Sequence, residues 1–356
     1  MDEKKTKKNV VKIIGLICIV MFFSCNKNQE RILNNNFIQQ DSLVATKIPI
    51  KEILNPVNMV LLKDYIVIQN EYLADENCFF IYQKGGDYNF LFSFGRLGQG
   101  AEEFIAPSIV NNNVDNELSI LDNARNVIRK YSVTSRSAEK IQEIKLKDIA
   151  YPFQELSYVN DSILLYRIMY KQGNVLYSYN IKTMSIIDSV NYESSFKRKM
   201  GNKYNSTLDV FNFANQKSDF VVTFNYINEI KNGKLNSNFT FDKSYSTKLN
   251  ADNFTPYMDN ALYNNYFYYM FPFMTEKYIY AIYMGREMKQ LQPFPINTGK
   301  RYFDAYIEIY DKNLNPIRRL KPDNDFMRIF VDEKDSSFYT WNPLEDFNFL
   351  LKYNLK

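Results

Sequence analysis

The chain has 356 residues, of which 46% are hydrophobic and 16% aromatic, enough for one large all-β domain or two average domains. It contains no histidine, which excludes histidine-based catalytic triads and HExxH zinc sites. The formal charge is +4, but residues 1–24 hold five lysines against Asp2 and Glu3, which leaves about +1 for the rest. This near-neutral balance gives no support for nucleic-acid binding.

The first 24 residues have the layout of a secretion signal. A lysine-rich start is followed by the apolar run 13–23, which is about half as long as the roughly 20 residues that span a bilayer. The run ends in Ser24-Cys25, and a small residue directly before a cysteine resembles a bacterial lipoprotein signal. That resemblance implies that Cys25 is lipidated and becomes the first residue of the mature protein. An uncleaved short anchor is the alternative.

The next residues are polar, and we interpret 25–40 as the lipidated cysteine and its tether. Residues 41–356 are then the folded domain. With either kind of anchor, we expect this domain to be held on a membrane outside the cytoplasm.

Two features recur six times along the folded domain, which predicts a repeat architecture. The first is a polar turn that opens an apolar strand, and it starts at Lys63, Asp115, Asn160, Ser218, Glu276 and Asp335. The second is a strand that ends in an aromatic residue, and these residues are Tyr82, Tyr131, Tyr179, Phe241, Tyr310 and Tyr353. Successive aromatic residues of this set are 43 to 69 positions apart.

Units of this length with about four short strands each are typical of a β-propeller. Helical patterns do not separate the strands, which argues against an α/β fold. The chain ends just after the third strand of the sixth unit, so its fourth strand must come from elsewhere. Residues 41–50 precede the first unit and are otherwise unpaired. We predict that they close the ring by completing the last sheet, which protects its edge.

The fourth and fifth units carry extra residues at 193–206, 228–238 and 285–302. We interpret the last two of these blocks as loops between the second and third strands of their units. Such loops share a face with the connections between units, of which residues 95–104 are one. Long loops gathered on one face are where function tends to reside.

The connection Gly95-Arg-Leu-Gly-Gln-Gly-Ala-Glu-Glu-Phe104, followed by Pro107, resembles a signature of six-bladed, TolB-like propeller lipoproteins of the Bacteroidota, Gly-x-x-Gly-Gln-Gly-Pro-Gly-Glu-Phe. Ala101 and Glu102 stand where Pro and Gly are usual in that family. Residues 277–286 and 306–311 resemble the family's fifth blade. The resemblance covers nearly all of the mature chain. It implies an all-β, six-bladed propeller and a lipid-anchored position in the cell envelope, at the outer membrane, but little chemistry.

Six residues are candidates for ligand binding: Arg96, Glu102, Glu103, Arg286, Tyr268 and Trp341. Glycines 95, 98 and 100 could expose successive amides as an anion nest, although glycine also supplies the positive φ of a tight crossover. Adjacent carboxylates on an extended chain point to opposite faces, so Glu102 and Glu103 are not expected to converge. The aromatic candidates suit a sugar platform, and packing in the core is their alternative role.

These features predict a non-catalytic binding or scaffolding module whose partners are the membrane, through the lipid on Cys25, and an envelope protein, peptide or glycan. We predict no cofactor, no metal ligands and no nucleic-acid partner. The alternative function is a divalent-cation-dependent hydrolase or lyase at the mouth of the propeller channel. Propellers host both roles, so the fold cannot choose between them. A cluster of acidic and amide side chains at the channel mouth, in which the pKa values of the carboxyl groups are raised or coupled, would favour the enzyme. An exposed apolar, aromatic patch would favour the binding module.

Overall fold

The computed structural model describes residues 36–53, 55–71, 77–112, 114–147, 149, 153–170, 173–191, 210–246, 266–287, 304–343 and 348–355. The chain divides into two units, Met1–Leu33 and Asn34–Lys356, and all described residues belong to the second. The signal region, Cys25 and the block 193–206 lie outside them. Within the described ranges, no helix is long and apolar enough to cross a bilayer.

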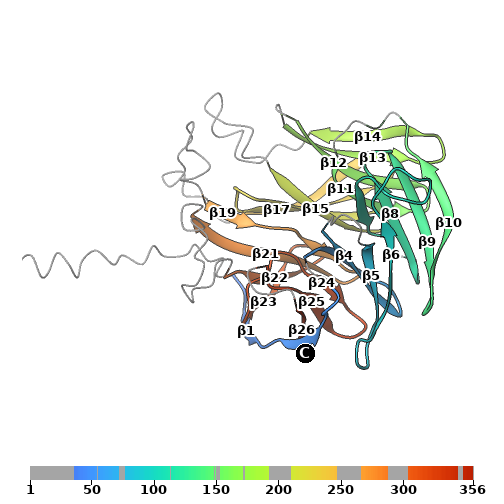
Figure 1. Cartoon of the computed structure of the whole chain (residues 1–356). Helices are drawn as coiled ribbons and strands as arrows, with labels where there is room; N and C mark the ends of the chain where they lie inside the picture. The colour runs from blue at the N-terminus through green and yellow to red at the C-terminus, as the bar shows by residue number, and fades with distance from the viewer. Residues whose placement is uncertain are drawn as a thin grey trace, which may run out of the picture. The chain divides into compact units, whose positions relative to one another are not determined.

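The described residues form six sheets that are arranged as a six-bladed β-propeller, which confirms the all-β prediction (Figure 1). The first three sheets each contain four consecutive strands. Their strands are β3 Pro56–Leu61, β4 Tyr65–Asn70, β5 Asn77–Gln83 and β6 Phe90–Arg96; β7 Pro107–Val110, β8 Glu117–Asp122, β9 Val127–Val133 and β10 Ala138–Lys145; and β11 Phe153–Asn160, β12 Ile163–Tyr170, β13 Gly173–Asn180 and β14 Ser185–Asn191.

The fourth sheet repeats this pattern, whereas the fifth and sixth each take one strand from the start of the chain. The strands of these three sheets are β15 Phe211–Gln216, β16 Asp219–Phe224, β17 Glu229–Leu235 and β18 Phe239–Ser246; β19 Tyr266–Tyr269, β20 Phe273–Met274, β21 Tyr278–Glu287, β22 Tyr306–Asp311, β23 Pro316–Pro322 and β1 Gln39–Leu43; and β24 Phe330–Asp332, β25 Ser337–Thr340, β26 Phe349–Asn354 and β2 Thr46–Pro49.

The recurring polar turn precedes the second strand in all six sheets, as the sequence predicts. Three of these turns contain a residue with positive φ, namely Asn116, Lys217 and Ser336. Asparagine adopts this left-handed conformation more readily than most residues, and the short polar turn lets the chain reverse into the next strand. The turns therefore mark where the second strand of each sheet begins.

Adjacent sheets pack face to face, so their middle strands are buried on both sides. β4 is buried at every position, whereas the outer strand β10 is mostly exposed. Between the first two sheets the rings of Phe79 and Phe104 meet edge to face, with centroids 5.7 Å apart. Between the sixth and first sheets Trp341 packs in one cluster with Phe80. These aromatic layers, rather than one central core, hold the ring together.

The N-terminal strap, which we define as residues 37–50, joins the fifth and sixth sheets. It is not one strand: β1 pairs parallel to β23, and β2 pairs antiparallel to β26 as the outer strand of the sixth sheet. Figure 1 shows the strap, in blue, beside the red-brown strands at the end of the chain. Arg318 donates to the Asp41 carboxylate at 2.5 Å and to the Leu355 carbonyl at 2.6 Å, so one side chain connects both ends of the domain.

Two predicted strand assignments in the fourth unit need correction. The block 228–238 is not a loop, because β17 occupies most of it, and Phe241 lies on the fourth strand β18 instead of closing the third. β17 has the polar sequence Glu-Ile-Lys-Asn-Gly-Lys-Leu, yet most of its residues are buried. In the block 285–302, β21 continues to Glu287, and residues 288–302 lie outside the described residues.

A substitution at a buried residue of the strap tests how much the packing of the strap contributes to the free energy of unfolding. Phe37 is 6% exposed and lies between the Arg319 guanidinium, 4.7 Å from its ring, and the Tyr310 ring, whose centroid is 5.3 Å away. Phe37→Ala should lower the free energy of unfolding by about 3 kcal/mol, because it leaves a cavity between aromatic and charged groups. Urea unfolding of the full chain, followed by the fluorescence of the single tryptophan, measures this loss.

The neighbouring Ile38 is 96% exposed and provides the matched control. Ile38→Ala should change the free energy of unfolding by less than about 0.5 kcal/mol. Equal effects of the two substitutions would show that the strap does not contribute to stability through Phe37.

Candidate functional site

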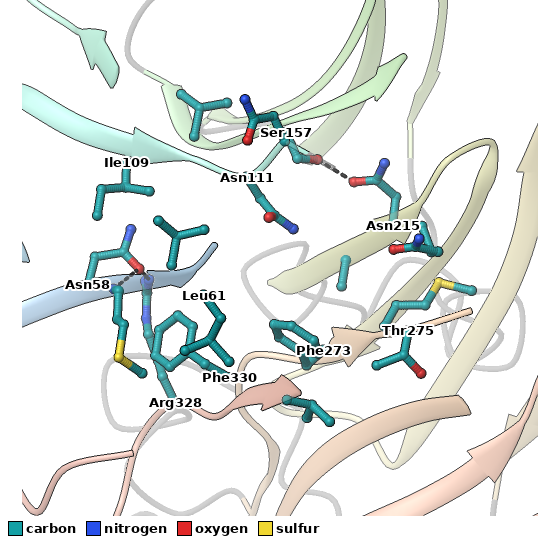
Figure 2. Close-up of a pocket in the computed structure, with 18 of the residues that line it drawn as sticks. Asn58, Leu61, Ile109, Asn111, Ser157, Asn215, Phe273, Thr275, Arg328 and Phe330 are labelled. Carbon is teal, nitrogen blue, oxygen red and sulfur yellow. Dashed lines mark hydrogen bonds between the residues drawn. The ribbon is translucent and has the colours of Figure 1, made fainter. Parts of the chain in front are cut away.

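A cavity of about 550 Å³ lies at the centre of the ring and is lined by residues of all six inner strands (Figure 2). The inner strands are β3, β7, β11, β15, β20 and β24. Neighbouring inner strands run parallel, as the bridge between Asn111 and Ser157 shows. They therefore begin at one end of the cavity and finish at the other. Cavities of roughly 300–1,000 Å³ are typical of sites for small organic ligands.

Part of the cavity wall is apolar. Leu61, Ile109, Phe273 and Phe330 come from four different inner strands, and Figure 2 shows them around the cavity. Phe330 stacks on the Trp341 ring, with centroids 5.8 Å apart, so its position is fixed from behind. Rigid aromatic and branched side chains of this kind give a ligand apolar contact area at a small entropic cost.

Carboxamide side chains line the rest of the wall. Asn215 is fully used by the protein: it accepts from the Ser157 hydroxyl and donates to the carbonyls of Tyr158 and Lys217, at 2.8 and 3.1 Å. Asn58 accepts from its neighbour's amide, Met59 N, at 2.9 Å. The Asn58 Nδ2 group and the Asn111 side chain have no hydrogen-bond partner among the described residues. These two amides are therefore available to a ligand.

A charged group of three residues lies where the inner strands begin. Glu155 Oε2 accepts from Phe213 N at 3.2 Å and lies 3.5 Å from Arg167 Nε. Burial raises the pKa of the Glu155 carboxyl, and the charges of Arg167 and Arg328 oppose that rise. Burial likewise lowers the pKa of both guanidinium groups, and Glu155 opposes this. Arginine stays protonated in proteins, so two positive charges share one carboxylate.

The opposite end of the cavity, where the inner strands finish, carries charges that are already paired. Lys84 Nζ lies 3.0 Å from Asp332 Oδ2, and Lys63 Nζ lies 3.4 Å from Asp115 Oδ2. The second pair is largely exposed and contributes little to stability. The same end also carries Glu276, Glu333 and Lys334, so both ends of the cavity are charged.

Among the described residues, no group of three or more Cys, Asp or Glu side chains is placed to hold a metal ion. The free thiol of Cys78 is buried, and burial raises its pKa to about 11. Cys78 is therefore a small core residue and not a reactive thiolate.

The glycine-rich turn at residues 95–104 is not an anion nest, because it presents carbonyl oxygens to its neighbours instead of amide groups. The carbonyls of Gly100 and Ala101 accept from Arg125 and Arg129, at 3.1 and 2.9 Å, and Glu103 O accepts from both arginines. The Gly100 amide donates to the Glu103 carboxylate at 2.8 Å. The turn thus satisfies its own amides and directs its carbonyls at cations of the second sheet.

The two carboxylates of this turn diverge, as the alternation of an extended chain predicts. Glu103 folds back onto the turn, whereas Glu102 is exposed and pairs with Lys140 at 2.8 Å. The Lys140 ammonium holds the pKa of Glu102 below its usual value. A shared acid–base role would need the two groups at one point, and the structure does not bring them together.

The other candidate residues are also dispersed, and the central cavity contains none of the six. Tyr268 and Trp341 are each 6% exposed and pack in the core, which leaves no ring face for a sugar. Arg286 is paired with Asp304. Arg96 is exposed at the end of β6. As ligand contacts, the exposed Arg96 and Glu102 stay predictions.

The sequence analysis did not identify the cavity residues, although the repeat contains their signal. Four of them stand six positions before an aspartate of the recurring turn, at Asp64, Asp115, Asp161 and Asp219. These four are Asn58, Ile109, Glu155 and Phe213. Equivalent positions of a repeat meet around its axis, so counting back from the turn gathers residues that are far apart in the sequence.

No protein-family model and no curated protein matches the chain. Solved structures do match it. A predicted exported protein of Bacteroides fragilis is 14% identical with a TM-score of 0.53, and the match covers 88% of this chain and 98% of that protein. A member of the DUF4221 family from Bacteroides vulgatus is 13% identical with a TM-score of 0.53, and the match covers 88% and 97%. At such identities the likeness shows the shared fold alone.

The turn at Gly95 can be tested by adding a single methyl group. Gly95 has a φ of 83°, and a Cβ there would lie 2.7 Å from Phe79 Cδ2. Gly95→Ala should therefore lower the free energy of unfolding by about 2 kcal/mol or more, because it adds a clash to an unfavourable φ. Gly86 has a φ of 57° and nothing within 4 Å of such a Cβ. Gly86→Ala should cost about 1 kcal/mol, from φ alone. Urea unfolding measures both, and equal losses would contradict the close contact at Phe79.

Proposed function

We propose that this protein is a membrane-anchored lipoprotein of the cell envelope whose propeller is a non-catalytic binding module. Its partner, an envelope protein, peptide or glycan, places a small group in the central cavity. The observation that carries this proposal is the cavity itself, which combines aromatic walls, two available carboxamides and an arginine that forms no salt bridge with a described residue.

The anchor rests on the sequence and on the resemblance to TolB-like lipoproteins of the Bacteroidota. Cys25 follows a lysine-rich start and an apolar run, and the polar stretch after it suits a tether. The Bacteroides protein with the same fold is itself a predicted exported protein, which agrees with an envelope location for this chain.

A divalent-cation-dependent hydrolase or lyase remains the second candidate, and the raised pKa of Glu155 is the observation that favours it. A neutral carboxyl can act as a general acid. However, Arg167 and Arg328 both act on that carboxylate, and their charges repel a cation bound beside it. These two guanidinium groups therefore oppose binding of a metal ion at Glu155.

Lipidation predicts where the full chain goes in a bacterial host that processes lipoproteins. The wild-type protein should enter the detergent-rich phase after phase separation, and its N-terminal peptide should carry the lipid mass on Cys25. Cys25→Ala should remove that mass and leave residues 1–24 attached, whereas Cys18→Ala, within the apolar run, should change neither the lipid mass nor the cleavage. A wild-type protein that keeps residues 1–24 and carries no lipid mass would indicate an uncleaved anchor instead.

The two candidate functions differ in their response to cations. We expect the unfolding midpoint of the full chain in detergent to be unchanged by calcium, magnesium or manganese, and by EDTA. A cation at about 100 times its dissociation constant would add roughly 2.7 kcal/mol and raise the midpoint by several degrees. Such a rise, reversed by EDTA, would favour the hydrolase over the binding module.

A further inference from the structure

The charges around Glu155 do not cancel. Its Oε2 atom is used by Phe213 N and by Arg167, which lies 3.5 Å away and is 4% exposed. Arg167 Nη1 is buried without a hydrogen-bond partner among the described residues. The charges of Arg167 and of a second arginine both act on the Glu155 carboxylate. One carboxylate cannot neutralise two guanidinium groups.

Arg328 is that second arginine. Its guanidinium lies over the Phe271 ring, 3.9 Å from the centroid, and its Nη1 atom donates to Asn58 Oδ1 at 3.4 Å. No salt bridge to Arg328 is found within the described part of the chain. A guanidinium has five N–H donors in a planar fork that fits a carboxylate, and here one long hydrogen bond to a neutral amide uses one of them. The remaining donors are available at the cavity.

The amide and aromatic side chains near Arg328 indicate which class of anion the cavity binds. The Nδ2 group of Asn58 and the side chain of Asn111 can bond hydroxyl groups, and Figure 2 shows Asn58 beside Arg328 and Asn111 on the wall of the same cavity. Phe273 and Phe330 supply flat apolar faces, which suit the C–H face of a pyranose ring. A cavity of about 550 Å³ has room for a monosaccharide and its neighbours in a short glycan.

We propose that the cavity recognises a sugar acid, with the carboxylate on the Arg328 guanidinium, a ring hydroxyl on the Asn58 amide, and a hydroxyl of the next sugar on Asn111, which follows the end of β7. This inference rests on the proposed binding function and names the chemical class of its ligand. Arg328 supplies both charge and geometry, because its fork pairs with a carboxylate through two parallel hydrogen bonds. The bound carboxylate then pairs with the positive charge of Arg328, which Glu155 alone does not neutralise.

Calorimetric titration of the full chain in detergent tests the inference with two probes of the same size. Sodium glucuronate should bind, and glucose, which has a hydroxymethyl group in place of the carboxylate, should bind at least about tenfold more weakly. Arg328→Gln should weaken glucuronate binding by about tenfold or more and leave glucose binding unchanged. The exposed Arg136, on the turn between β9 and β10, provides the control, and Arg136→Gln should have no effect on either sugar.

A second variant keeps the test valid if Arg328→Gln does not fold. Asn58→Asp retains the oxygen that accepts from Met59 N and Arg328, but it places a carboxylate beside the guanidinium. It should reduce glucuronate affinity by about tenfold or more without lowering the unfolding midpoint by more than a few degrees.

Three results would overturn the inference. Equal binding of glucose and glucuronate, unaffected by either variant, would leave a sugar-binding module without recognition of an anion. Glucuronate binding that requires calcium and is lost with EDTA would place the carboxylate on a cation instead of Arg328, and would leave the binding function standing. Binding of neither probe to the wild-type chain would show that the cavity does not take sugar acids.

Discussion

The structure depends on sheets that cover one another's faces. β4 is buried along its whole length because the first sheet lies between two neighbours, and the middle strands of the other sheets are mostly buried for the same reason. A single sheet of this kind would expose two apolar faces, so none of the six is expected to be stable alone. A circular arrangement solves this problem, since the last sheet then covers the first. The ring must close, and the closure falls to the N-terminal strap.

The same constraint explains the cavity. The inner strands meet at the axis, where no further sheet can cover them, so the packing that fixes the aromatic layers does not fix the residues at the centre. Polar side chains such as Asn111 and Arg328 can therefore occupy positions that would otherwise need apolar partners. A fold held together by its outer layers leaves its axis free for recognition.

The sequence predicted the fold well because its strongest local signal, the polar turn before each second strand, depends on backbone geometry that every sheet needs. It failed where tertiary burial overrides local composition. β17 is rich in lysine, asparagine and glycine, which favours a loop, but its neighbours on both sides bury it. The parallel pairing of β1 could not be predicted, because nothing in Gln-Gln-Asp-Ser-Leu favours one strand direction over the other.

The cavity was harder to predict, because each inner strand contributes a few residues to it and the contacts join distant parts of the chain. Asn58 and Arg328 are 270 positions apart. Motif reasoning instead selected residues that are conspicuous locally, such as Trp341, whose large apolar surface is what the aromatic layers require. Asn58 and Glu155 each stand six positions before an aspartate of the recurring turn. This shared position in the repeat is the only signal in the sequence that relates the two residues before a structure is known.

The strap also has a consequence for biogenesis. β2 precedes all but one of the described strands, yet its partner β26 follows all the others. The sixth sheet can therefore form only after the strands of the other five sheets have been synthesised, and until then β2 has an unpaired edge. Contacts of such long sequence separation fold slowly, and exposed edges invite pairing with other chains. A chaperone that shields the leading segment until β26 has been synthesised would relieve this problem.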